Sequence, residues 1–148
     1  MRLLLLLLRP IYYLLYHQFA WAYDFVASLV SLGQWQDWVR TALPYLDGRV
    51  LEIGFGPGHL QVEMQGRGLR PFGIDESRFM ARQASRRMKK AGADPRLARG
   101  LAQALPYPAG TFDAAAATFP AEYIFDPRTL DEVHRVLAPG GTFVILPS

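Results

Sequence analysis

Cysteine is absent from this chain of 148 residues, which excludes disulfides, thiolate zinc sites and cysteine nucleophiles. The three histidines, His17, His59 and His134, lack the spacing of metal ligands, so we predict no metal site. No internal repeat is present, and the one biased segment is the leucine run at residues 3–8. The chain is 51% hydrophobic, which at this length suffices for one structural domain with a core but not for two.

Positive charge is unevenly distributed along the chain. Residues 49–100 contain eleven basic and five acidic side chains, whereas residues 101–148 contain two basic and five acidic ones. The excess is densest in RFMARQASRRMKK, at residues 78–90. Such a run is typical of a solvated helix face, and the alternative is a surface that meets anionic lipid headgroups or nucleic acid. We do not favour nucleic acid as a partner.

A long uninterrupted apolar run is also lacking, although the first thirty residues are rich in leucine and aromatic side chains. A transmembrane helix needs about 20 consecutive apolar residues, but Arg9 and Pro10 interrupt the segment after six leucines. A signal peptide would use residues 3–8 as its apolar region and the AWA at 20–22 as its cleavage site. The same Arg9 and Pro10 and the bulky aromatic residues before that site disfavour this interpretation.

An amphipathic helix is the third interpretation of this segment, because apolar residues recur with the helical period from Ile11 to Val30. A shorter helix is predicted over 34–43, and Pro44 with Asp47-Gly48 marks a boundary. We therefore expect a helical lid or membrane-facing segment over 1–48 and a core over 49–148, together forming one structural domain. A cytoplasmic location, with the chain either free or peripheral on the inner membrane face, fits this pattern and the absence of cysteine.

From residue 49 onward, short apolar runs alternate with amphipathic segments. This alternation predicts parallel βαβ units, and therefore an α/β, doubly wound, Rossmann-like sheet of about five strands after a helical N-terminal segment. In such sheets, ligands bind beyond the carboxyl ends of the strands. The expected strands are 49–53, 70–74, 96–99, 113–118 and 142–146, and the expected helices are 59–65, 77–90 and 127–137. Ser77 and Asp126 are the predicted N-caps of the last two helices.

A glycine-rich turn follows the first strand in VLEIGFGPGHL, residues 50–60. Glycine permits positive φ and leaves no Cβ between the backbone and a ligand. A dinucleotide fingerprint would need a third glycine where His59 stands, and a Walker A loop would need Gly-Lys-Ser/Thr. The carboxylate of Glu52 would repel a pyrophosphate and attract an amine. The remaining alternative is a plain tight turn between strand and helix.

Asp75 closes the second strand, 17 residues after Gly58. A carboxylate at this position commonly accepts hydrogen bonds from two ribose hydroxyls. Its alternative role is an N-cap of the next helix, which Ser77 could supply instead.

Four motifs in order resemble the class I S-adenosylmethionine-dependent methyltransferases, in the branch of the ubiquinone/menaquinone and phospholipid N-methyltransferases. They are VLEIGFGPGHL, GIDES, LPYPAGTFDAAAATF and EVHRVLAPGGTFVIL, and they span residues 49–146. The resemblance implies S-adenosylmethionine as cofactor, laid across the strand ends. By motif position, Glu52, Gly54, Phe55, Gly56 and Gly58 would hold its amino-acid part, Asp75 its ribose, Glu76 and Met80 its adenosine, Leu101 and Ala102 its adenine, and Thr118 its methionine end.

Two departures from the family pattern stand out. Many relatives carry an acidic residue that binds the adenine amine where this chain has Leu101, so adenine would rely on the backbone of Ala102 and on apolar packing. The family sheet has seven strands, whereas this chain stops at Ser148, just past the fifth. We expect strands six and seven to be missing, with a partner copy or a further C-terminal segment covering the fifth strand, since a bare edge invites aggregation.

The sequence does not name a catalytic base. Tyr23 and Tyr123 are the candidates. Tyr23-Asp24 resembles a lid element of relatives in which the tyrosine lines the cofactor pocket, and Tyr123 belongs to the segment 118–123, which we expect to face the methyl group. The leading hypothesis is transfer of a methyl group to a small, apolar, lipid-like or quinone-like acceptor. The alternative is a catalytically incomplete protein of this fold that binds cofactor or a partner chain.

Overall fold

The computed structural model describes residues 34–147. The chain divides into two units, Met1–Asp37 and Trp38–Ser148, and the second contains the sheet. The predictions for the leucine run, for the helix over 11–30 and for Tyr23 lie outside the described residues, and the lid-and-core division at residue 48 stays a prediction. No helix within residues 34–147 is long and apolar enough to cross a membrane.

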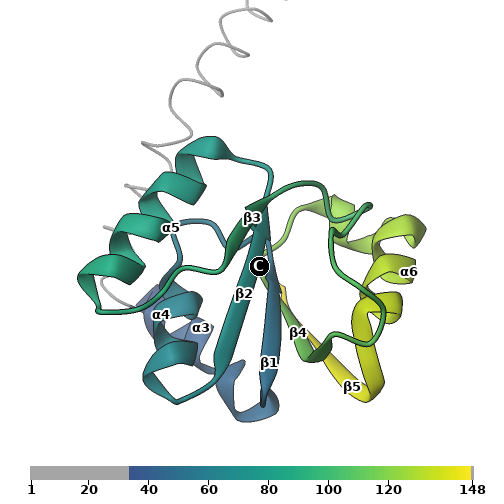
Figure 1. Ribbon diagram of the computed structural model, residues 1–148, viewed down its shortest axis with the longest axis horizontal. Coiled ribbons are helices and arrows are strands. Elements are labelled where there is room, and N and C mark those ends of the chain that lie inside the picture. The colour runs from purple at the N-terminus through teal and green to yellow at the C-terminus, as the bar shows by residue number, and fades with distance from the viewer. Residues whose placement is uncertain (1–33, 148) are drawn as a thin grey trace, which may run out of the picture. The chain divides into compact units, whose positions relative to one another are not determined.

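Five parallel strands form one sheet in the order β3-β2-β1-β4-β5 (Figure 1). The chain winds outward from β1 to β3, then returns to the other side of β1 for β4 and β5. The change of direction falls between β1 and β4, where such sheets bind ligands. The predicted doubly wound fold is confirmed. The strands are β1 (Arg49–Ile53), β2 (Arg70–Asp75), β3 (Leu97–Arg99), β4 (Phe112–Thr118) and β5 (Leu137–Leu146).

Helices cover both faces of this sheet: α4 and α5 lie on one face and α6 on the other (Figure 1). The predicted caps are confirmed, since Ser77 Oγ accepts from the N–H of Met80 at 3.2 Å and Asp126 Oδ1 accepts from the N–H of Arg128 at 2.9 Å. The helices are α3 (Gln34–Arg40), α4 (His59–Gly66), α5 (Arg78–Lys90) and α6 (Pro127–Val136), with 3₁₀ turns η1 (Leu43–Tyr45) and η2 (Glu122–Phe125).

The start of β5 differs from the prediction. The strand begins at Leu137, five residues before the expected Thr142, because Leu137 already pairs with Phe112. The next pair joins Ala114 to Thr142, so residues 138–141 bulge out of the ladder. Proline lacks an N–H for the ladder, and glycine supplies the positive φ of +79° at Gly140. The APGG segment, residues 138–141, is therefore a bulge within the strand.

The main apolar core lies where α6 covers the sheet. Phe112 is its centre: the ring packs edge-on against Phe72 and Tyr107, with centroids 5.4 and 5.0 Å apart. The alanines of β4, residues 114–117, are completely buried and leave room for larger side chains of neighbouring elements. The same core cluster includes Ile53, Ile74 and Ala117, near the carboxyl ends of β1, β2 and β4, so it also supports the strand ends on which the cavity depends.

Close packing of α4 on α5 requires glycine at position 58. Gly58 has φ +82°, and a Cβ there would lie 2.7 Å from the Cβ and 2.9 Å from the Cα of Ala84 in α5. Real Cβ atoms do not approach that closely, so the glycine sets the distance between the turn after β1 and α5.

We predict that Gly58→Ala destabilises the protein more than Gly68→Ala. Gly68 has nearly the same φ, +80°, but nothing lies within 4 Å of its added Cβ. Both variants incur the left-handed strain of about 1–2 kcal/mol, and only Gly58→Ala adds overpacking of about 1–3 kcal/mol. Chemical denaturation of both variants measures the difference in unfolding free energy. Equal losses would show that α4 and α5 can separate without cost.

Candidate functional site

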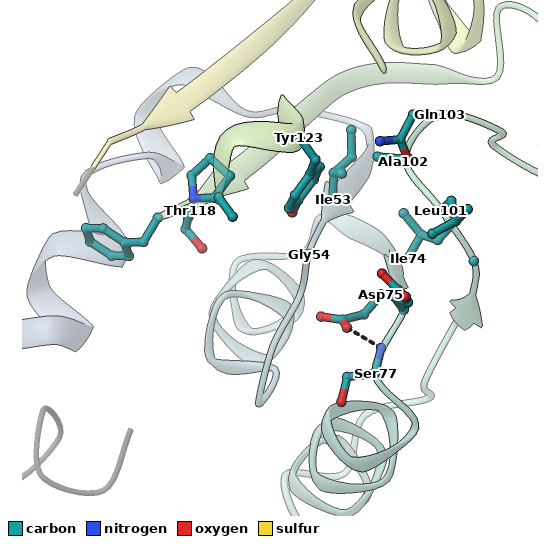
Figure 2. Close-up of a pocket in the computed structure, with 15 residues that line it drawn as sticks. Ile53, Gly54, Ile74, Asp75, Ser77, Leu101, Ala102, Gln103, Thr118 and Tyr123 are labelled. Carbon is teal, nitrogen blue, oxygen red and sulfur yellow. Dashed lines mark hydrogen bonds between the residues drawn. The ribbon is translucent and has the colours of Figure 1, made fainter. Parts of the chain in front are cut away.

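A cavity of about 550 Å³ opens at the carboxyl ends of β1, β2 and β4 and beside the loop after β3 (Figure 2). Its volume is typical of small-molecule sites. Figure 2 shows Thr118 on one side, Leu101 on the other and Asp75 between them. The walls come from residues 53–54, 74–77, 100–103 and 118–121, together with Tyr123.

Gly54 lines this cavity directly after β1. Its φ is +72°, and a Cβ at this position would collide with the hydroxyl of Tyr123. The phenol therefore lies directly over the glycine turn. The N–H of Gly54 donates to the carbonyl of Ile74 at 2.8 Å, which fixes the turn against the end of β2. Glycine is thus needed here for two reasons, the backbone conformation and the space that Tyr123 occupies.

Asp75 connects the glycine turn to the start of α5. Its Oδ2 accepts from the N–H of Gly56 at 2.9 Å. Its Oδ1 accepts from the N–H of Ser77 at 2.8 Å, the bond that is dashed in Figure 2. Each carboxylate oxygen can accept a further hydrogen bond. Because Ser77 serves as N-cap of α5, Asp75 is not needed in that role. The cavity therefore contains a held carboxylate with acceptor capacity remaining.

Glu52 lies beneath the turn and not on the cavity wall. Its side chain is buried, with 1% exposed, and its Oε2 accepts from Gln61 Nε2 at 2.8 Å. Burial raises the pKa of Glu52 to about 8; the Gln61 hydrogen bond lowers it, and the charge of Asp75 raises it further. The carboxyl is therefore mostly neutral at pH 7. The sequence suggested that Glu52 attracts an amine, but only the ionised carboxylate would do so.

Tyr123 is the candidate for catalysis within the described residues. Burial raises the pKa of its phenol to about 12, and the charges of Asp75 and Glu52 add to this rise. The phenol consequently keeps its proton at neutral pH, so it can donate a hydrogen bond into the cavity but is poorly suited as a base.

Comparison with known proteins now assigns this site to a family. The model of the methyltransferase domain family matches residues 50–141, which include the cavity and all five strands in whole or in part. This chain belongs to the methyltransferase domain family. The family predicted from the four motifs is thereby confirmed.

Three relatives illustrate the similarity. A demethylmenaquinone methyltransferase of Thermus thermophilus is 33% identical over 139 residues, covering 89% of this chain and 63% of that protein. A SAM-dependent methyltransferase structure from Thermotoga maritima superimposes with a TM-score of 0.69 at 27% identity, covering 88% of this chain and 58% of that one. The [4+2]-cyclase SpnF superimposes with a TM-score of 0.66 at 28% identity, covering 74% of this chain and 43% of that one. The chain therefore spans less than two thirds of the length of each.

The methyltransferase domain brings together about half of the residues predicted for its site. The cavity is lined by Gly54, Asp75, Glu76, Leu101, Ala102, Thr118 and Tyr123. Five others do not line it. Glu52 and Phe55 are buried beneath, Gly56 and Gly58 shape the turn, and the N–H of Met80 bonds Ser77.

Some wall residues escaped sequence reasoning. Gln103 lies on the wall beside Ala102, where the sequence drew attention only to the missing acid at Leu101 (Figure 2). In the segment after β4, residues 119–121 line the cavity as well, and the feature that the sequence did not indicate there is the positive φ of 50° at Phe119, which is uncommon for a bulky residue. No sequence pattern marks such a conformation.

An ion pair on α6 supports the loop that carries one wall. Arg135 Nη1 donates to the carbonyl of Tyr107 at 2.7 Å and Nη2 to that of Leu105 at 3.0 Å, while Glu132 Oε2 accepts from the N–H of Leu105 at 2.7 Å. Glu132 and Arg135 also pair with each other at 2.7 Å. The motif EVHR therefore holds the loop of this wall from outside the cavity. The spacing of three between its acid and its base was the sequence feature that could have indicated the ion pair.

We predict that stability falls as pH rises from about 5 to 8, because folding keeps Glu52 protonated. A carboxyl whose folded pKa lies above its unfolded value adds stability below the unfolded pKa, near 4.5, and this is lost up to the folded pKa, near 8. The slope from this group is at most about 1.4 kcal/mol per pH unit. Denaturant unfolding of Glu52→Gln across this range should show a flatter profile.

The matched control is Glu122→Gln, which neutralises an exposed carboxyl of the same chain. It should retain the slope of the unmodified protein. If Glu52→Gln keeps that slope as well, Glu52 is ionised in the folded state and burial does not control it.

Proposed function

We propose that this chain binds S-adenosylmethionine in the 550 Å³ cavity and transfers its methyl group to a small apolar acceptor of the quinone type. Family membership supports the cofactor, as does the similarity to a solved structure named as a SAM-dependent methyltransferase. The name of the Thermus relative, a demethylmenaquinone methyltransferase, supports the acceptor class.

The observation that carries the proposal is the Asp75 carboxylate beside the glycine turn. Its two oxygens are held by the N–H groups of Gly56 and Ser77 and keep lone pairs for two ligand hydroxyls. A ribose fits this arrangement, because its two adjacent hydroxyls can each donate a hydrogen bond to the carboxylate. We assign the ribose to Asp75, the methionine end to Gly54 and Thr118, and the adenine to the wall of Leu101 and Ala102.

Leu101 is 51% exposed and offers no acceptor to the adenine amine. In our assignment adenine packs on the apolar side chains of Leu101, Ala102 and Ile74, which all line the cavity. The absent hydrogen bond is worth about 1 kcal/mol, so we expect weaker binding rather than none.

The bound cofactor supplies a methyl group that is already activated by a sulfonium. The residues of this chain then have to align that methyl with an acceptor and exclude water, which is catalysis by proximity and orientation. Tyr123, over Gly54 and still protonated, is placed to orient the ligand by donating a hydrogen bond. We assign it a positioning role in place of the role of a base.

The second candidate is a protein of this fold that binds cofactor without transferring a methyl group. One observation favours keeping it: a related structure is named as a [4+2]-cyclase. Binding and transfer must therefore be measured separately.

Calorimetric titration tests the cofactor. We expect S-adenosylhomocysteine to bind in the micromolar range and NADH not to bind, because His59 stands where a dinucleotide fingerprint has its third glycine. The opposite result would overturn the proposal. If S-adenosylhomocysteine binds, transfer of a labelled methyl group from S-adenosylmethionine to a demethylmenaquinone distinguishes an enzyme from the second candidate.

We predict that Asp75→Ala weakens binding of S-adenosylhomocysteine at least tenfold, a loss of about 1.4 kcal/mol. The variant removes both the acceptor for the ribose and the bond that holds Gly56. Asp75→Asn should lose less, since its carbonyl oxygen can still accept one of these bonds. Asp131→Ala, at an exposed position on α6, is the control and should bind like the unmodified chain. Unchanged affinity in a folded Asp75→Ala protein would limit Asp75 to a structural role.

A further inference from the structure

The outer face of α5 carries five exposed cations. Arg78, Arg82, Arg86, Lys89 and Lys90 are all exposed, and the helix contains no acidic residue. At 100° per residue these side chains fall on one arc of the helix, opposite the buried Ala84 and Met88. With 13 residues, the helix presents this arc over about 20 Å.

These five cations have no acidic partner within the part of the chain that the structure describes, since none of its ion pairs includes them. Arg87 differs, because it turns inward and donates to the carbonyl of Pro57. α6 differs as well, because its two basic residues, Arg128 and Arg135, are balanced by Asp131 and Glu132. The charge of the outer face of α5 is therefore left for a partner from outside.

Phe79 lies within the same arc and is 54% exposed. An exposed aromatic ring among cations is typical of helices that lie on a membrane surface, where the ring enters the apolar boundary and the cations meet headgroups. Nucleic acid would use the cations equally, but the surface of a duplex offers no apolar layer for the ring of Phe79. The combination favours a lipid surface.

The cationic face of α5 lies next to the cavity. Glu76 and Ser77 line the cavity, and the cationic face begins at the next residue, Arg78. A membrane that contacts the first turn of α5 therefore lies beside the rim of the cavity.

We propose that the outer face of α5, with Phe79 at its first turn, docks on membranes that contain anionic phospholipid. The contact does not depend on methyl transfer. It would bring the rim of the cavity to the surface in which an apolar molecule dissolves.

Co-sedimentation of the full chain with vesicles of equal parts phosphatidylglycerol and phosphatidylcholine tests this proposal. We expect binding that weakens with added salt and is absent with pure phosphatidylcholine. Arg82→Glu/Arg86→Glu should weaken binding at least about thirtyfold, since each cation near an anionic surface accounts for about fivefold. Phe79→Ser should weaken it further in either background.

The matched control is Arg67→Glu/Arg70→Glu, which changes the net charge equally at two exposed residues outside α5. It should retain most of the binding, and all variants should bind S-adenosylhomocysteine like the unmodified chain.

Equal losses of vesicle binding in both double variants would show that net charge alone, and not the face of α5, determines binding. If vesicle binding is lost only when Leu3–Leu8 is deleted, that segment and not α5 contacts the membrane. Tighter binding to duplex DNA through Arg82 and Arg86 would assign the face to nucleic acid. Each of these results, or no binding at all, overturns the proposal.

Discussion

The hydrogen bonds at the end of β2 hold the site together. The Asp75 carboxylate fixes the N–H groups of Gly56 and Ser77, while the backbone carbonyls of Ile74 and Asp75 accept from Gly54 and Gly100. One strand end thus connects the turn after β1, the start of α5 and the loop after β3. Hydrogen bonds to a charged acceptor are worth about 1.5–3 kcal/mol each. The carboxylate can therefore both shape the cavity and remain an acceptor within it.

Glycine allows these segments to approach so closely. Gly54 leaves room for the Tyr123 hydroxyl, Gly58 for Ala84, and Gly73 for the ring of Phe55, whose Cδ1 would lie 2.7 Å from an added Cβ. Only the first of these contacts is in the cavity. The other two lie behind it and set how near α4 and α5 come to the sheet. The turn VLEIGFGPGHL therefore meets two demands, the packing of helices and the open floor of a ligand site.

The sequence predicted the strands, the helices and the family well, because each depends on local pattern. Alternating apolar runs gave four strand starts within one residue, and Ser77 and Asp126 gave two helix starts. The exception was β5, whose first pair depends on Phe112, 25 residues earlier in the chain.

The site was less predictable, because its properties arise from residues distant in the sequence. The motif placed Glu52 beside a ligand, but contact with Gln61 and complete burial put it behind the wall and favour its neutral form. The acid–base spacing of the EVHR motif could be recognised in the sequence. Its hydrogen bonds to the backbone of Leu105 and Tyr107 could not, because those residues lie about thirty positions earlier and only the fold brings them together. Gln103 and the strained backbone of Phe119 left no pattern at all.

The electrostatics of the cavity also limit the chemistry that it supports. Three titratable side chains line it within the described residues: Tyr123 keeps its proton, Asp75 is already held by two N–H groups, and Glu76 is an exposed carboxyl. Glu52, one layer below, is mostly neutral at pH 7. A reaction that required a strong base would find none among these groups. Methyl transfer from a sulfonium needs alignment more than proton removal, so a cavity rich in hydrogen-bonding groups and poor in bases fits that reaction. An acceptor that must first lose a proton would then depend on the carboxyl of Glu76 or on a base from outside these lining groups.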